Sequence, residues 1–244
     1  MESLENKVII ITGAAQGMGQ SHAKKCIEEG AYVVVTDLNR EAGQKTAEEL
    51  GDNALFIAHD VTNEDDWNRV VDTVMDKWGR IDVLVNNAGI TFHTPLEDLD
   101  LASYMKIVNI NQVSVFLGMK AVAKPMKQQK NGDIINISSI NGIVGGAIGY
   151  TDTKFAVRGM TKAAAKELSP HNIRVNSIHP GVIQTPMLEQ EGVKQQVEEF
   201  VKTIPIRRTA EAEEVSNMIV FLASDVSSYA TGSEFILDGG VTAL

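Results

Sequence analysis

The fold is decided by VIIITGAAQGMG, residues 8–19, close to the start of the chain. Its first four residues are β-branched, which is typical of a strand buried on both faces of a sheet. Gly13 ends this strand, and a helical pattern over residues 18–29 follows. Gly17 and Gly19 lack a Cβ atom, so a phosphate group can approach the backbone there. Because a helix N-terminus adds free N–H groups and the positive end of a dipole, the stretch predicts a phosphate-binding turn.

A second apolar strand, YVVVTD over residues 32–37, ends in an acid. A carboxylate at this place can accept hydrogen bonds from the adenosine ribose, and it repels a phosphate on the 2′ oxygen. The glycine turn alone is weak evidence, but together with Asp37 it predicts dinucleotide binding and favours NAD over NADP. Gln16, just before the second glycine, is not a cation, which also favours NAD over NADP. The cofactor residues expected in this part are Gly13, Gln16, Gly17, Met18, Gly19 and Asp37.

Composition narrows the class of protein. The 244 residues are 43% hydrophobic and 22% charged, as in an ordinary globular protein of one large domain. A formal charge of −10 disfavours nucleic acid or an anionic membrane as the main partner. A lone cysteine, Cys26, excludes an internal disulfide and favours a reducing compartment. Residues 1–7 are charged, and no apolar run approaches the ~20 residues that span a bilayer, so we expect a cytoplasmic protein.

Strand and helix patterns alternate along the whole chain. Strands are predicted over residues 8–11, 32–37, 54–60, 81–86, 133–137, 173–178 and 234–237. Helices are predicted over residues 18–29, 41–50, 64–78, 99–129, 150–168, 188–202 and 211–223. The fourth of these helices is expected to break near Asn109 and to kink or restart at Pro125.

This alternation indicates parallel strands joined by right-handed crossovers. We therefore predict an α/β, doubly wound fold in one domain, residues 1–244, with a seven-stranded parallel sheet flanked by helices on both faces. Ligands of such sheets bind at the carboxyl ends of the strands. The polar and glycine residues at those ends are Gly13, Asp37, Asp60, Asn87, Ser139 and Gly181.

A phenol and an ammonium occupy positions i and i+4 of one predicted helix, at Tyr150 and Lys154. A phenol with a pKa near ~10 is a poor acid–base group at neutral pH, and a neighbouring cation lowers that pKa. Such a pair is common on amphipathic helices. Three further features favour an acid–base site over an ordinary helix surface. They are a hydroxyl at the ligand edge (Ser139), an amide in the preceding helix (Asn111) and the small-residue turn after Asn87.

The combination resembles the short-chain dehydrogenase/reductase family over residues 7–240. The motifs that carry the resemblance are Thr12-Gly13-x-x-x-Gly17-x-Gly19, Asn86-Asn87-Ala88-Gly89, Asn111, Ser139, Tyr150-x-x-x-Lys154, Pro180-Gly181 and Asp238-Gly239-Gly240. The resemblance implies a Rossmann-type oxidoreductase in which Tyr150 is the acid–base residue and Ser139 holds the substrate oxygen. Lys154 would lower the tyrosine pKa and bind the nicotinamide ribose, and Asn111 would hold a water linked to Lys154.

The same resemblance implies further cofactor contacts. Asp60 and Val61 would flank the adenine, Asn87 would contact the adenosine, and Ile183 with Thr185 would hold the nicotinamide carboxamide. Family members are commonly homotetramers, and the apolar stretches at residues 113–119 and 155–168 are candidate interfaces. Some relatives bind a metal at the C-terminus, but residues 242–244 offer no carboxylate side chain, and no metal site is expected.

Two departures from the family concern the substrate side. The segment between Ser139 and Tyr150 is shorter than usual, which weakens any transfer of substrate from relatives. Asp152 and Thr153 replace the small residue and serine common inside the Tyr–Lys motif, and little mechanistic effect is expected from them.

The pocket is expected to be apolar, with a substrate lid at about residues 184–203. Its expected lining includes Ile140, Ile143, Val144, Ile148, Met187 and Leu188. This favours an NAD-dependent dehydrogenase of apolar secondary alcohols or ketones, of the hydroxysteroid, acetoin or (R)-alcohol type. The alternatives are a 3-oxoacyl thioester reductase using NADPH and a non-catalytic NAD-sensing protein. His93 is more consistent with a surface loop than with substrate contact.

Overall fold

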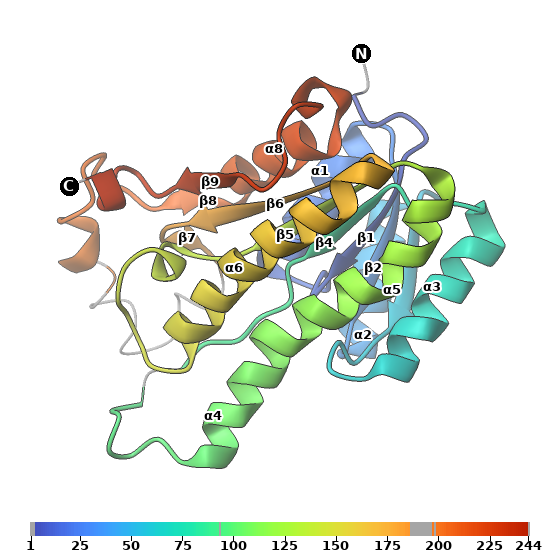
Figure 1. Ribbon diagram of the computed structural model, residues 1–244. Helices are drawn as coiled ribbons and strands as arrows, with labels where there is room; N and C mark the ends of the chain where they lie inside the picture. Colours follow the sequence, from blue (N-terminus) through green and yellow to red (C-terminus); the bar gives the residue numbers. More distant parts are fainter. Residues whose placement is uncertain (1–2, 93, 186–196, 198, 244) are drawn as a thin grey trace.

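A computed structural model describes residues 3–92, 94–185, 197 and 199–243, and its centre is one seven-stranded parallel sheet (Figure 1). The strand order is β3-β2-β1-β4-β5-β6-β9, and every neighbouring pair is parallel. The strands are β1 (Val8–Thr12), β2 (Tyr32–Asp37), β3 (Ala54–Ala58), β4 (Val83–Asn86), β5 (Gly132–Ile137), β6 (Ile173–Pro180) and β9 (Glu234–Leu237). The predicted fold class is confirmed.

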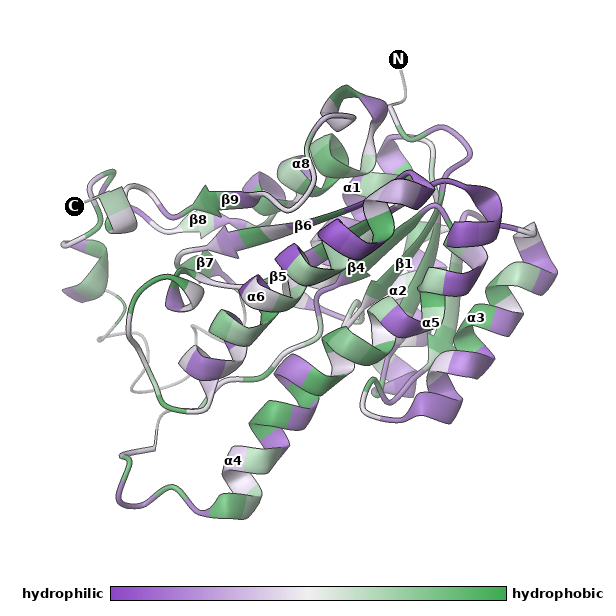
Figure 2. Cartoon of the chain, in the orientation of Figure 1, coloured by the Kyte–Doolittle hydropathy of each residue, from purple (hydrophilic) through white to green (hydrophobic). Residues whose placement is uncertain are grey.

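Helices cover both faces of the sheet. One face packs against α3 (Glu64–Trp78), α5 (Ser114–Gln129) and α6 (Tyr150–Leu168), and the other against α1 (Gly17–Glu28), α2 (Arg40–Leu50) and α8 (Ala212–Ala223). Successive side chains of a strand point to opposite faces. Val8 and Ile10 accordingly join the α3–α5–α6 core, whereas Ile9 and Ile11 join the α1–α8 core. Burial on both faces explains the uninterrupted apolar strands, which stand out in Figure 2.

The chain order reverses at β1, which lies between β2 and β4. At such a switch point the loops that follow the two neighbouring strands diverge and leave a crevice at the carboxyl ends. The loops after β1, β2, β4 and β5 all leave the sheet at this edge. The predicted ligand edge and the observed topology therefore agree.

The long predicted helix is divided differently from the expectation. It begins as α4 (Leu101–Val108), passes through a π-helical turn at Asn109–Val113 and continues as α5. The irregularity near Asn109 is this π-helical turn rather than the expected break, and the restart expected at Pro125 is wrong, because α5 runs through this residue to Gln129. Pro125 is buried and removes only one helical hydrogen bond, the one to the carbonyl four residues earlier.

A second, two-stranded sheet was not predicted. β7 (Ile183–Gln184) pairs in parallel with β8 (Ala210–Glu211). Strands of this length are too short to show the alternation from which strands are predicted. The helix predicted over residues 188–202 and most of the lid expected at about 184–203 lie outside the described residues.

A buried histidine joins α1 to α8, and its burial predicts that the stability of the folded protein depends on pH. The Nδ1 atom of His22 lies 2.8 Å from the Ser216 hydroxyl, and burial lowers the His22 pKa from 6.5 to about 3. Between these values the unfolded chain binds a proton that the folded chain excludes, so stability falls as the pH falls below about 6.5. We expect His22→Asn to reduce this fall by up to about 1.4 kcal/mol per pH unit.

The measurement is urea unfolding of wild type and His22→Asn at several pH values between 4.5 and 7.5. Asparagine keeps a polar group near the Ser216 hydroxyl but does not titrate. The exposed His171 provides the matched control for the loss of a histidine, and His171→Asn should leave the urea midpoint at pH 7.5 unchanged. Equal pH dependence in wild type and His22→Asn would contradict the prediction.

Candidate active site

The turn after β1 is fixed to the end of β4 by a set of four hydrogen bonds. The Asn87 side-chain amide donates to the carbonyl oxygens of Thr12 (2.9 Å) and Gly13 (3.1 Å). The Thr12 hydroxyl accepts from the backbone N–H groups of Asn87 and Ala88, both at 3.0 Å. Thr12 belonged to the family motif but was assigned no role. The only feature of the sequence that indicated a role for Thr12 was its position directly before the first glycine.

The glycine turn leaves room beside its backbone. Gly17 has a φ of +59°, and a Cβ atom built there meets no atom within 4 Å. Gln16 precedes α1 as its N-cap without a capping side-chain bond, so the first N–H groups of the helix remain available. The side-chain oxygen of Asn87 is buried and has no hydrogen-bond partner among the described residues. Free donors beside an open backbone and a buried unpaired acceptor fit the phosphate and hydroxyl groups of a dinucleotide.

Asp37 lies across the turn from these groups. One of its carboxylate oxygens accepts from the Ala15 N–H at 3.1 Å, and the other accepts from the Asn39 N–H at 2.9 Å. The residue is half-buried, and Leu38 beside it is 73% exposed. The carboxylate thus borders the glycine turn on the side of β2, where an adenosine ribose would lie. Arg40, on α2, is exposed.

The loop after β3 holds the next expected pair, Asp60 and Val61. The Asp60 carboxylate accepts from the N–H and the hydroxyl of Thr62 at 2.9 and 2.7 Å. The Val61 carbonyl accepts from the indole of Trp67, and its side chain packs against the α3–α5–α6 core. Both residues are therefore held in one conformation. Met18, the remaining expected residue of the glycine turn, packs against the α1–α8 core.

The acid–base candidates converge from β5 and α6. Ser139 follows β5 and caps a short 3₁₀ turn, where its hydroxyl accepts from the Asn141 N–H at 3.1 Å. Tyr150 is the first residue of α6, and its phenol lies close enough to the Ser139 hydroxyl for that hydroxyl to influence the Tyr150 pKa. Lys154 lies one turn later, with its Nζ atom 5.4 Å from the centre of the Tyr150 ring. The predicted spacing therefore brings all three groups together.

The electrostatics of these groups are set mainly by burial. Burial raises the pKa of Tyr150, and the hydrogen bond from Ser139 opposes that shift. Burial also lowers the pKa of Lys154 to about 8, while its Nζ atom donates to the Ile137 carbonyl at 2.9 Å. The lowering of the Tyr150 pKa expected from Lys154 is thus not found, because the ammonium faces a backbone carbonyl and is itself poorly solvated.

Asn111 lies in the π-helical turn and is buried. Its side-chain oxygen accepts from the Ile90 N–H at 2.8 Å, and its amide donates to the Ile90 carbonyl at 2.9 Å. The side chain that was expected to orient a water is therefore paired with the loop after β4. A Cβ atom on Gly89 would lie 3.4 Å from the Asn111 oxygen and 3.6 Å from Lys154 Nζ, so this loop borders the catalytic candidates.

The two departures inside the Tyr–Lys motif tie the start of α6 to its neighbours. Asp152 accepts a hydrogen bond from the Tyr104 hydroxyl of α4 at 2.7 Å. The Thr153 hydroxyl donates to the Tyr150 carbonyl at 2.7 Å and lies 3.5 Å from the Asn111 amide. Both residues thus support the position of Tyr150 from outside the site.

Of the expected nicotinamide contacts, Ile183 is buried on β7, and Thr185 is the last residue before the gap at 186–196. Met187, Leu188 and His93 lie outside the described residues. Ile140 is buried, and Val144 and Ile148 are 40% and 44% exposed on the segment between Ser139 and Tyr150. This segment presents apolar side chains beside the site.

A conservative change tests the close packing of the glycine turn. A Cβ atom on Gly19 would lie 2.2 Å from the Gly13 carbonyl oxygen and 2.7 Å from the Asn87 amide nitrogen. We expect Gly19→Ala to lower the free energy of unfolding by about 1–3 kcal/mol and to abolish NADH binding, because the turn must move. Urea unfolding and NADH fluorescence titration measure the two effects. Lys24→Ala, on the exposed side of the same helix, should change neither, and normal NADH binding by Gly19→Ala would contradict the prediction.

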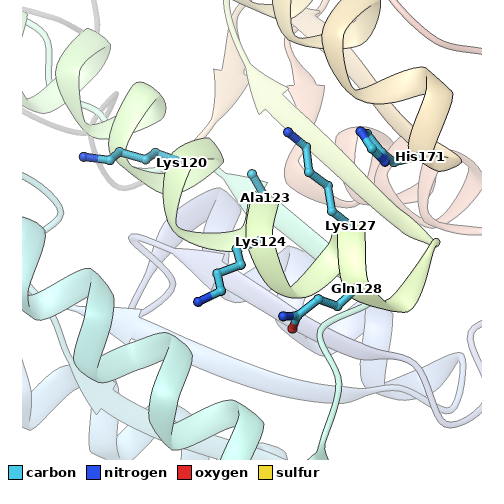
Figure 3. A pocket seen from close by; sticks show the side chains of 6 residues that line it. All are labelled: Lys120, Ala123, Lys124, Lys127, Gln128 and His171. Carbon is cyan, nitrogen blue, oxygen red and sulfur yellow. The ribbon is translucent and has the colours of Figure 1, made fainter.

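A hollow of about 420 Å³ lies away from these residues (Figure 3). It is lined by Lys120, Ala123, Lys124, Lys127, Gln128 and His171. The C-terminal half of α5 leads into the start of β5, so this hollow lies toward the opposite end of the sheet from the crevice. Among the described residues, no group of three or more His, Cys, Asp or Glu is placed to hold a metal, and no helix has the length and apolar character to cross a membrane.

Comparisons with known proteins agree with this geometry. The family model described as enoyl-(acyl carrier protein) reductase matches residues 13–242. A 3-alpha-(or 20-beta)-hydroxysteroid dehydrogenase of Mycobacterium tuberculosis is 48% identical over 98% of this chain and 91% of its own length. A cyclopentanol dehydrogenase of Comamonas sp. is 44% identical over the full length of both chains. The crystal structure of gox2181 superposes with a TM-score of 0.96 at 31% identity, covering 100% of this chain and 99% of that one.

Proposed function

Because this chain belongs to the short-chain dehydrogenase/reductase family and is an oxidoreductase, we propose that it transfers hydride between NAD(H) and an apolar secondary alcohol or ketone. The observation that carries the proposal is the convergence of Ser139, Tyr150 and Lys154 beside the crevice at the carboxyl edge of the sheet. A phenol with a hydroxyl and an ammonium nearby provides the groups that proton exchange with an alcohol oxygen requires.

Each of these residues has a separate task in the proposal. Tyr150 gives its proton to the carbonyl oxygen in reduction and removes it from the alcohol in oxidation. Ser139, whose hydroxyl lies near the phenol, holds that oxygen within reach of it. Lys154 would bind the hydroxyl groups of the nicotinamide ribose, and its pKa of about 8 places its own titration near neutral pH. Asn111 supports the site by holding the loop after β4 through Ile90.

The bound nicotinamide supplies the chemistry of hydride donation and acceptance. The residues that would hold the dinucleotide are Gly13, Gln16, Gly17, Met18, Gly19, Asp37, Asp60, Val61, Asn87, Tyr150, Lys154, Ile183 and Thr185. We propose NAD rather than NADP because the Asp37 carboxylate borders the turn where a 2′-phosphate would have to lie. The unpaired Asn87 oxygen and the open space at Gly17 support the binding of a dinucleotide at this turn.

The proposed substrate is a compact apolar secondary alcohol, such as a cyclic alcohol or a hydroxysteroid. The exposed apolar side chains of Val144 and Ile148 beside Ser139 favour such a molecule over a phosphorylated or carboxylated one. Relatives that cover nearly the whole chain carry names that refer to hydroxysteroids and to cyclopentanol. In both classes the secondary alcohol belongs to a molecule with an apolar carbon ring.

We further propose that the enzyme is a cytoplasmic homotetramer. Phe116 on α5 and Phe155 on α6 are 50% and 41% exposed, and contact with a second copy would bury them. The buried, unpaired Cys26 agrees with a reducing compartment. Light scattering measures the assembly, and a monomer at micromolar concentration would contradict this part of the proposal.

The experiment for the reaction is an initial-rate panel with both cofactors. It contains cyclopentanol, a 3α-hydroxysteroid, a 20β-hydroxysteroid, their ketones and a 3-oxoacyl thioester, each with NAD(H) and NADP(H). We expect the secondary alcohols and ketones to turn over with NAD(H). Preference for the thioester with NADPH would instead indicate a 3-oxoacyl thioester reductase. NADH binding without turnover of any compound would indicate a nucleotide sensor.

A further inference from the structure

A fully buried histidine, His179, lies behind the catalytic serine on β6. Its Nδ1 atom is 3.0 Å from the carbonyl oxygen of Ser139, and its Nε2 atom is 2.9 Å from the hydroxyl of Ser177. The proposed proton exchange does not use this side chain. Both ring nitrogens are satisfied, so the ring has one orientation in which all of its polar atoms are paired.

The chemistry of the partners determines where the proton of the ring lies. A carbonyl oxygen only accepts hydrogen bonds, so Nδ1 of His179 must carry hydrogen and donate to Ser139. Burial lowers the pKa of His179, although Glu234 and the Ser139 carbonyl oppose the shift. In the resulting neutral ring Nε2 accepts, and the Ser177 hydroxyl donates to it rather than to the Ser233 carbonyl 3.5 Å away.

The contact lies just beyond the end of the β5–β6 ladder. The last paired residues are Ile137 and Ile178, and the Ser138 N–H donates to the Ile178 carbonyl at 2.8 Å. One residue later the chain leaves the sheet, and backbone pairing with β6 stops. The imidazole of His179 continues the connection by binding the Ser139 carbonyl from the same strand.

The Ser139 carbonyl therefore accepts two hydrogen bonds, one from His179 and one from the Gly142 N–H at 2.9 Å. These bonds fix the peptide group that follows the Ser139 Cα atom, and the hydroxyl of the same residue is close enough to Tyr150 to influence the pKa of the phenol. The Asn141 N–H, which donates to that hydroxyl, belongs to the same 3₁₀ turn. Loss of the imidazole bond would allow the whole turn to rotate, and the hydroxyl would move with it.

We propose that His179 is a positioning residue that holds Ser139 in register with Tyr150 through the Ser139 backbone carbonyl. The inference rests on the proposed function, because it assigns His179 a part only if Ser139 orients the substrate oxygen. Displacement of a positioning group by about 1 Å can cost roughly 100-fold in rate, whereas binding of the dinucleotide on the other side of the crevice should not change.

Two substitutions distinguish the loss of the hydrogen bond to Ser139 from the loss of the rest of the imidazole ring. In His179→Asn the amide nitrogen is attached at Cγ, as Nδ1 is, and can still donate to the Ser139 carbonyl. In His179→Gln the amide lies one bond further out, near the position of Nε2, and reaches Ser177 instead. Both variants are polar, uncharged and smaller than histidine. A role limited to packing or folding would therefore affect them similarly.

The measurements are kcat and KM for the secondary alcohol of the panel with the highest kcat/KM, NADH affinity and the unfolding midpoint. We expect His179→Gln to lower kcat about 10- to 100-fold with unchanged NADH affinity. His179→Asn should stay within about threefold of wild type, since it keeps the donor. Equal kcat in the two variants, or a kcat of His179→Gln that matches wild type in a folded protein, would overturn the inference.

A double-mutant comparison shows whether His179 acts through Ser139. In the Ser139→Ala background, His179→Gln should cause no further loss of kcat, because the hydroxyl that it positions is absent. An additional loss of the same size as in wild type would overturn the inference. Wild-type activity in Ser139→Ala itself would instead refute the role of Ser139 on which the inference rests, whereas no turnover of any compound by the wild type would refute the proposed function. Inactivity of Ser139→Ala with a fully active His179→Gln would leave the proposed function intact and refute only the role of His179.

Discussion

Tyr150→Phe is expected to lower kcat about 10²- to 10⁴-fold, the range that a positioned general acid–base group contributes. Phenylalanine keeps the ring at the start of α6 but removes the hydroxyl that exchanges a proton with the substrate oxygen. The same change removes the hydroxyl that lies near Ser139. The measurement is kcat with the best secondary alcohol of the panel, together with NADH affinity from fluorescence titration, which should change little.

The control for this variant is Tyr229→Phe. Tyr229 is fully exposed, and the same chemical change there should leave kcat and NADH affinity at the wild-type values. A folded Tyr150→Phe variant that keeps more than a tenth of the wild-type kcat would show that another group exchanges the proton. The assignment of Tyr150 would then fail, although the family would not be in question.

Asp37→Asn is expected to have the second largest effect, on the choice of cofactor. The change removes the negative charge and replaces one carboxylate oxygen by a donor, while the side chain keeps its size. A hydrogen bond to a charged group contributes about 1.5–3 kcal/mol, so kcat/KM with NAD should fall by about 10- to 100-fold. kcat/KM with NADP should rise, because the repulsion of its 2′-phosphate is removed. The measured quantity is the ratio of the two kcat/KM values.

Leu38→Arg should add to this change when combined with Asp37→Asn. Leu38 is exposed directly after β2, so an arginine there can reach a 2′-phosphate without displacing a buried group. Glu41→Gln is the matched control, because it removes the same charge from the exposed first turn of α2. If Glu41→Gln shifts the ratio as much as Asp37→Asn, the effect is one of overall charge. Preference of wild type for NADP(H) would refute the assignment of Asp37.

Much of the architecture could be predicted from local patterns. The apolar runs of β1, β2 and β4 identify strands buried on both faces, and the structure shows their residues alternating between two cores. The bounds of α3, α6 and β9 were predicted to the residue, since Asn63, Gly79 and similar neighbours mark the ends of these elements. Tyr150 and Lys154 share a helix, so their proximity followed from spacing alone.

Other features depend on partners that are distant in the sequence. The amide of Asn111 was expected to face water, but the loop after β4 brings the Ile90 backbone to it. The pKa of Tyr150 was expected to fall beside Lys154, but burial from surrounding elements raises it. Pro125 was expected to kink a helix or mark a restart, and α5 continues through it. In each case packing against another segment decided the outcome.

The sequence by itself determined the order and type of the elements, the glycine turn at the end of β1 and the helix that carries Tyr150 and Lys154. These depend on periodicity, turn chemistry and spacing, all of which act within a few residues. Only the tertiary structure decided that Thr12 and Asn87 fasten β1 to β4, and that His179 binds the Ser139 carbonyl. Such bonds join residues 40 or more positions apart, and they form because adjacent parallel strands end at one edge of the sheet.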